Sequence, residues 1–95
     1  MVLTNQKRGF DMNNTHKQQH VIQELINNGV IQSVRAAPVP MSNTGYNLYF
    51  YDKKANNVAI LAAQRGDLRD FKTLDAVAAL VKNMGLSTFA VTLRT

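Results

Sequence analysis

The sequence predicts a small α+β domain whose elements follow the order α-β-β-β-(β)-α-β. Two segments, residues 15–28 and 73–84, repeat apolar residues at helical spacing and are followed by Gly29 and Gly85. The segments between and after them resemble short strands, several with apolar and polar residues in alternation. Because such short elements must share one core, we expect an antiparallel or mixed sheet with both helices on one face.

The length of 95 residues corresponds to one domain near the lower size limit for independent folding. The polar residues 1–14 are interpreted as a flexible N-terminal arm, and residues 15–95 as a single α+β domain. Much of the apolar fraction is Ala and Val, which predicts a thin core. Association into a homo-oligomer would stabilise such a core, although composition alone does not establish it.

The chain contains no cysteine, which excludes a disulfide framework and any thiolate metal site. No apolar run approaches the roughly 20 residues of a membrane span. The N-terminus lacks the apolar region of a secretory signal. The expected location is therefore the cytoplasm, with no membrane partner.

The first helix is expected over residues 15–28. Thr15 and Gln18 form a capping-box pattern, in which each side chain can accept a hydrogen bond from the other residue's backbone N–H. Gly29 provides the left-handed stop. Four apolar residues share one face of this helix, namely Val21, Ile22, Leu25 and Ile26.

The middle of the chain predicts a short strand at residues 30–35 and a hairpin formed by residues 46–52 and 57–63. A surface loop with two prolines is expected at residues 36–44, because proline removes backbone donors. The polar turn at residues 53–56 has hairpin length. The second hairpin strand is apolar on both faces and should therefore lie inside the sheet.

The last third of the chain predicts a turn at residues 64–67, a short strand at 68–71, a second helix and a final strand at 88–94. Thr73 is the expected N-cap and Gly85 the expected stop. The buried stripe of this helix should comprise Leu74, Val77, Ala78, Val81 and Met84. The inward residues of the final strand should be Phe89, Val91 and Leu93.

The formal charge of +5, from eleven Lys and Arg residues against six acids, favours an anionic partner such as nucleic acid. Five basic residues flank the hairpin turn and the turn before the second helix. If these turns converge, they form a phosphate surface that binds DNA without reading its sequence. The residues are Lys53, Lys54, Arg65, Arg69 and Lys72. The alternative explanation is scattered charge that keeps the protein soluble.

Tyr49 and Tyr51 share one face of their strand and adjoin Lys53 and Lys54. A sheet that carries aromatic rings beside lysines can stack unpaired bases and hold their phosphates. The alternative is cross-strand aromatic packing or burial beneath a helix.

The sequence offers no reaction centre. His16 and His20 are four residues apart, but no further histidine or cysteine completes a metal site. Surface ion pairing and helix capping explain Asp67, Asp70 and Asp75, which alternate with basic residues. Without a nucleophile beside a base or a glycine-rich phosphate loop, we expect a protein that is not an enzyme and has no cofactor and no metal.

Residues 65–93 resemble a family of small plasmid-borne, partition-associated proteins of the ParC type, which is unrelated to the topoisomerase subunit of that name. The pattern is an Arg-Gly turn, an arginine and a phenylalanine, a Leu-Asp helix start, a glycine and an alternating strand. The matching positions are Arg65, Gly66, Arg69, Phe71, Leu74, Asp75, Ala78, Gly85, Phe89, Val91 and Leu93. The resemblance extends over residues 18–93 and implies a non-enzymatic role in plasmid maintenance or transfer.

Charge and resemblance together lead to the expectation of an accessory protein of plasmid maintenance. It would bind DNA, or a DNA-associated plasmid or host protein, through its basic surface. The alternative is an interaction module that modulates a host or plasmid protein without contacting nucleic acid. Salt-dependent retention on DNA would favour the first class.

Overall fold

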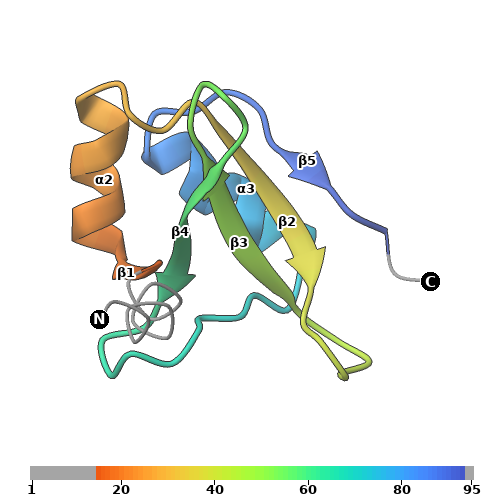
Figure 1. Ribbon diagram of the computed structural model, residues 1–95. Coiled ribbons are helices and arrows are strands. Elements are labelled where there is room, and N and C mark those ends of the chain that lie inside the picture. Colours follow the sequence, from red (N-terminus) through yellow and green to blue (C-terminus); the bar gives the residue numbers. More distant parts are fainter. Residues whose placement is uncertain (1–14, 94–95) are drawn as a thin grey trace, which may run out of the picture.

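The computed structural model describes residues 15–93, which form an α+β fold with a mixed five-stranded sheet and two helices (Figure 1). The α+β class predicted from the sequence is confirmed. The elements in chain order are β1 (His16–Gln18), α2 (Gln19–Asn27), β2 (Ser33–Pro38), β3 (Tyr46–Tyr51), β4 (Asn57–Ala62), α3 (Leu74–Asn83) and β5 (Ala90–Val91).

The strands lie in the order β1-β4-β3-β2-β5. The three longer strands β2, β3 and β4 form an antiparallel meander, while β1 runs parallel to β4 and β5 runs parallel to β2. The predicted hairpin is therefore present as β3 and β4. Strand β4 has a neighbour on each side, as its two apolar faces predicted.

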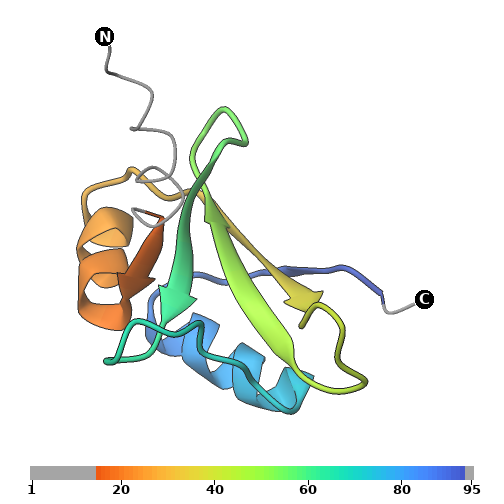
Figure 2. The same ribbon diagram turned by 60° about the horizontal axis from the view of Figure 1, so that its bottom comes forward.

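Both helices pack on the same face of the sheet, as expected, because Ile22 of α2 and Val77 and Val81 of α3 belong to one core cluster with the strands. Figures 1 and 2 show α3 across the back of the sheet and α2 beside its β1 edge. Gln23 of α2 donates a hydrogen bond from Nε2 to the carbonyl oxygen of Met84 at 2.9 Å and so joins the two helices. The strands contribute buried side chains from Val34, Ala36, Leu48, Phe50, Ala59 and Leu61 to this core. The helices contribute Ile22, Val77 and Val81, and Met84, the C-cap of α3, is buried with them.

The start of the first helix was predicted wrongly. The helix begins at Gln19 and not at Thr15, because residues 16–18 form strand β1 beside β4. The backbone N–H of Ile60 donates to the carbonyl oxygen of Thr15 at 2.7 Å, so pairing with the sheet replaces the expected capping box. Gln18 is the N-cap and makes no side-chain cap hydrogen bond, whereas Gly29 has the predicted positive φ of 80°.

Strand β2 is displaced from the predicted residues 30–35 to Ser33–Pro38. The backbone N–H groups of Val30 and Ile31 both donate to the carbonyl oxygen of Leu25, so these residues close the helix end instead of entering the sheet. The strand continues into the predicted loop and ends at Pro38, opposite Tyr46.

The second helix largely follows the prediction. The backbone N–H of Ala76 donates to Thr73 Oγ1 at 3.2 Å, and Gly85 ends the helix with a φ of 96°. Ala78 is exposed and not buried as predicted, since α3 turns Val77 and Val81 toward the sheet.

Two further strand predictions were wrong. Residues 68–71 make only isolated bridges, from Leu68 to Ala62 and from Phe71 to Tyr46. Strand β5 contains only Ala90–Val91, and Leu93 beyond it is 79% exposed. In both segments sheet pairing, and not residue alternation, sets the length of the strand. The predicted flexible arm at residues 1–14 lies outside the described residues.

Candidate functional site

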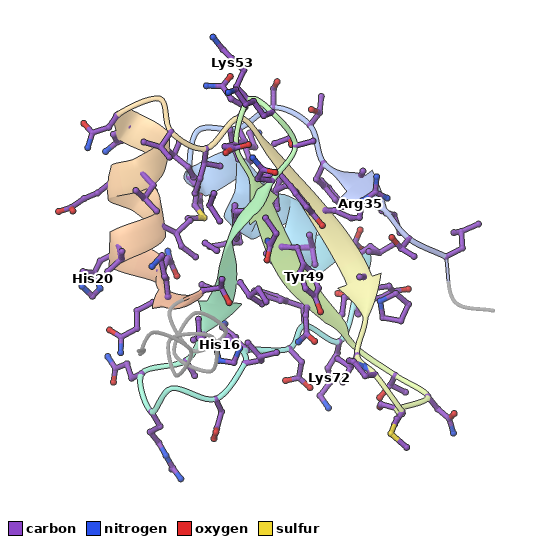
Figure 3. All side chains as sticks on the ribbon, viewed as in Figure 1. His16, His20, Arg35, Tyr49, Lys53 and Lys72 are labelled. Carbon is purple, nitrogen blue, oxygen red and sulfur yellow. The ribbon has the colours of Figure 1, made fainter. Side chains whose placement is uncertain are left out.

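The sheet face opposite α2 and α3 is covered by no helix of residues 15–93, and we call it the helix-free face. Tyr49 of β3 pairs with Arg35 of β2 and Ile60 of β4, and Ile60 pairs with His16 of β1. Paired residues share a face, so these side chains form one row across the sheet, and Tyr51 lies two residues further along β3. Figure 3 shows His16, Arg35 and Tyr49 on the side toward the viewer, with α3 behind the sheet.

The helix-free face is basic and aromatic. None of the five strands contains Asp or Glu. Arg35 and His16 are exposed, and the rings of Tyr49 and Tyr51 are half-buried. Arg35 Nη1 donates to Thr92 Oγ1 at 3.2 Å, which ties the guanidinium to the segment after β5. An anionic or aromatic ligand would meet no carboxylate from the strands on this face.

The hairpin tip between β3 and β4 extends this face with two exposed lysines, Lys53 and Lys54. The carboxylate of Asp52 accepts hydrogen bonds from the backbone N–H groups of Asn56 and Lys54, each at 2.9 Å. The Asn56 hydrogen bond, aided by the one from Lys54, lowers the pKa of Asp52. Asp52 therefore remains ionised and organises the turn at neutral pH.

The five predicted phosphate contacts do not converge. Lys53 and Lys54 precede β4, whereas Arg65, Arg69 and Lys72 follow it, so the two groups lie at opposite ends of that strand. A six-residue strand is about 20 Å long at about 3.3 Å per residue. Figure 3 shows Lys53 and Lys72 at opposite ends of the molecule, with Tyr49 between them. The expected approach of the hairpin tip and the later turn was wrong.

Arg69 is already engaged by neighbouring side chains. Its Nη1 donates to Gln19 Oε1 at 3.3 Å, and its guanidinium carbon lies 4.7 Å from the centre of the Phe71 ring. The buried Asn47 donates from Nδ2 to the Arg69 carbonyl oxygen at 3.2 Å, which attaches the segment after β4 to the start of β3. All three basic residues of this segment, Arg65, Arg69 and Lys72, are exposed, but the Arg69 side chain also contacts Gln19 and Phe71.

A hollow of about 550 Å³ lies beside the start of α2. Its lining contains Arg69, His20, Ala62, Ala63 and four glutamines, and no carboxylate. The four glutamines are Gln18, Gln19, Gln23 and Gln64. Two of them donate to backbone carbonyl oxygens, Gln18 Nε2 to that of Gln64 and Gln23 Nε2 to that of Met84, and Gln19 accepts from Arg69 as described above.

The histidines and acids singled out in the sequence form no metal site within residues 15–93. His16 belongs to β1 and His20 to α2, so they do not share a helix face as their spacing suggested. The acids of the last third, Asp67, Asp70 and Asp75, are all exposed.

Arg35 is a candidate site residue that the sequence patterns did not single out. Its alternation with the buried Val34 and Ala36 is visible in the sequence, but the displaced strand prediction obscured its pairing with Tyr49.

Neither helix of the described chain is long and apolar enough to cross a membrane. A scan of the chain against protein-family models finds no matching family. Searches of curated proteins and of solved structures find no match either. Any function must therefore be argued from the site itself.

Proposed function

We propose that the protein is a non-enzymatic nucleic-acid-binding protein that holds a single strand along the helix-free face. The observation that supports this most directly is the packing of both helices on the other face. This packing leaves Tyr49 and Tyr51 beside Arg35 on a sheet without acidic residues. Aromatic rings on a sheet stack unpaired bases of any sequence, and adjacent cations hold the phosphates.

The arrangement favours a single strand over a duplex. Stacking on Tyr49 or Tyr51 requires a base whose face is free, and in a duplex the bases already stack on one another. Lys53 and Lys54 at one end of the face and Lys72 at the other provide charge for the backbone on either side of the rings (Figure 3). The lysines at the hairpin tip and the basic residues after β4 do not form one patch. They would instead contact the bound strand at its two ends.

Fluorescence anisotropy with a labelled single-stranded oligonucleotide and its matched duplex tests the proposal. We expect tighter binding of the single strand. Tyr49→Ser should weaken it by about 1–3 kcal/mol, the contribution of one stacked base. This corresponds to a roughly five- to 150-fold higher Kd. Tyr49→Phe keeps the ring and should retain the affinity.

The salt dependence tests the phosphate contacts separately. Replacing Lys53 and Lys54 by Gln should flatten the plot of log K against log salt by about 0.7 per lost contact. The pair Arg65→Gln with Lys72→Gln tests the other end of the path. Lys82→Gln, which removes an exposed charge from the last turn of α3 on the opposite face, is the matched control.

The binding measurements distinguish a single-strand-binding protein from a duplex-binding protein and from a protein-interaction module. Equal or tighter binding of the duplex would contradict the single-strand proposal. If neither nucleic acid is retained at low salt, the protein-interaction alternative takes precedence. DNA is the expected nucleic acid and plasmid maintenance the expected context because of the sequence resemblance. Faster plasmid loss from dividing cells that carry Tyr49→Ser would support that context.

A further inference from the structure

A second hollow, of about 400 Å³, lies beside Tyr51. Its lining includes Ser33, Arg35 and Tyr51 from the strands and Ala55 from the hairpin tip. Thr88, in the segment that enters β5, also lines it. Ser33 pairs with Tyr51, and Arg35 lies two residues after Ser33 on the same face. Val34 and Phe89, which also line the hollow, lie toward the core. The hollow therefore opens between β2 and β5 onto the helix-free face, at the end where Lys53 and Lys54 lie.

The lining groups match the chemistry of a nucleobase. Tyr51 provides an aromatic ring and Arg35 a planar guanidinium, and both kinds of surface stack on bases. Ser33 and Thr88 are exposed and carry hydroxyl groups that can donate to or accept from the base edge. The lining contains no carboxylate. The volume lies within the range of about 300–1,000 Å³ that is usual for small-molecule pockets.

The walls of this hollow are held in place before any ligand binds. Ala55 has a positive φ of 68° in a turn whose N–H groups bond to Asp52. On the other side, Arg35 is tied to Thr92 by its Nη1 hydrogen bond of 3.2 Å. An arginine has five N–H donors, so this bond leaves others for a ligand.

We propose that this hollow receives one unpaired base of the bound strand, stacked against Tyr51, with its phosphate beside Lys53 and Lys54. This inference rests on the proposed function, because it specifies which part of the nucleic acid occupies that end of the helix-free face. Tyr49, in the next row of the sheet, then stacks a neighbouring base.

Backbone amide NMR of the ¹⁵N-labelled protein tests the hollow independently of oligonucleotide binding. Adenosine or thymidine, which carry a base and no phosphate, should shift the amide signals of Ser33, Arg35, Ala55 and Thr88. Ribose 5-phosphate should leave the signals of Ser33, Arg35 and Thr88 unchanged, because its phosphate would contact only the hairpin tip that carries Lys53 and Lys54. Shifts with ribose 5-phosphate and none with the nucleosides would overturn the assignment of a base.

The variant Thr88→Phe fills the hollow from an exposed position and should weaken single-strand binding about tenfold, within the range for one stacked base. Its salt dependence should stay unchanged, because no phosphate contact is lost. Thr44→Phe makes the same change at an exposed position of the β2–β3 connection and should have no effect.

The two proposals fail in different ways. Single-strand binding without nucleoside shifts at the hollow, and unaffected by Thr88→Phe, would overturn the base assignment and leave the helix-free face intact. Nucleoside shifts at the hollow without any oligonucleotide binding would support the hollow and overturn the proposed function.

Discussion

Val81 of α3 offers the most direct test of how the helices cover the sheet. Its side chain is 2% exposed and lies in the core cluster with Val77 and Met84. Val81→Ala removes two methyl groups, worth about 1.6 kcal/mol at roughly 0.8 kcal/mol each. The cavity left behind raises the expected loss of unfolding free energy to about 2–3 kcal/mol.

This loss is large for so small a protein. At about 0.05–0.15 kcal/mol per residue, a chain of this length has a total stability of about 5–14 kcal/mol. A loss of 1 kcal/mol lowers Tm by about 4–8 °C in a domain of this size, so Val81→Ala should melt about 10–20 °C below the wild type. Val81→Asp should lose more, because it buries a carboxylate without a partner.

Thermal unfolding followed by circular dichroism measures these differences, and Ala78→Asp is the matched control. Ala78 lies on the same helix but is exposed, so its carboxylate stays in water. The cost should stay below about 1 kcal/mol, the difference in helix propensity. A wild-type melting curve for Val81→Asp, or an equally low Tm for Ala78→Asp, would refute the assigned helix face.

Two further predictions concern the turns. Gly85→Val should lower the Tm, because a left-handed backbone costs an L-residue about 1–2 kcal/mol and a β-branched residue more. A Cβ there would meet no atom within 4 Å, so Gly85→Asn should be milder, and equal Tm values for the two variants would contradict this. Asp52→Asn should be less stable than the wild type at pH 7, because the hydrogen bonds from Asn56 and Lys54 hold the pKa of Asp52 below its usual value in the folded state. The stabilisation by ionised Asp52 is present above the pKa of the unfolded state and is lost as the pH falls through the lower folded-state pKa. The urea midpoints of the wild type and Asp52→Asn should therefore converge below pH 4. A difference in midpoint that stays constant with pH would contradict this prediction.

Local rules in the sequence predicted the α+β class, the hairpin of β3 and β4, and helix α3 with its ends. Thr73 and Gly85 act through hydrogen bonds and backbone conformation within a few residues, so their effects do not depend on the rest of the fold. Val77 and Val81 follow from helical periodicity in the same way.

Pairing between distant strands determined the features of the fold that local sequence rules did not predict. Residues 16–18 extend a plausible helix by sequence, but they become a strand because β4 offers them a parallel partner 44 residues further along the chain, as in the pairing of His16 with Ile60. Strand pairing also aligns Arg35 of β2 with Tyr49 of β3. Lys53 and Lys72 lie at opposite ends of the molecule as a result of the strand arrangement.

The sequence by itself thus determined which basic and aromatic residues are available for a binding site, because charge and residue type can be read without the structure. Only the tertiary structure decided which of them share a surface. The packing of both helices on one face leaves the tyrosine side of the sheet without a helix, while the length of β4 separates the two lysine groups. The physical reason is that strand pairing and helix packing join residues far apart in the chain, and short-range sequence patterns do not encode those partners.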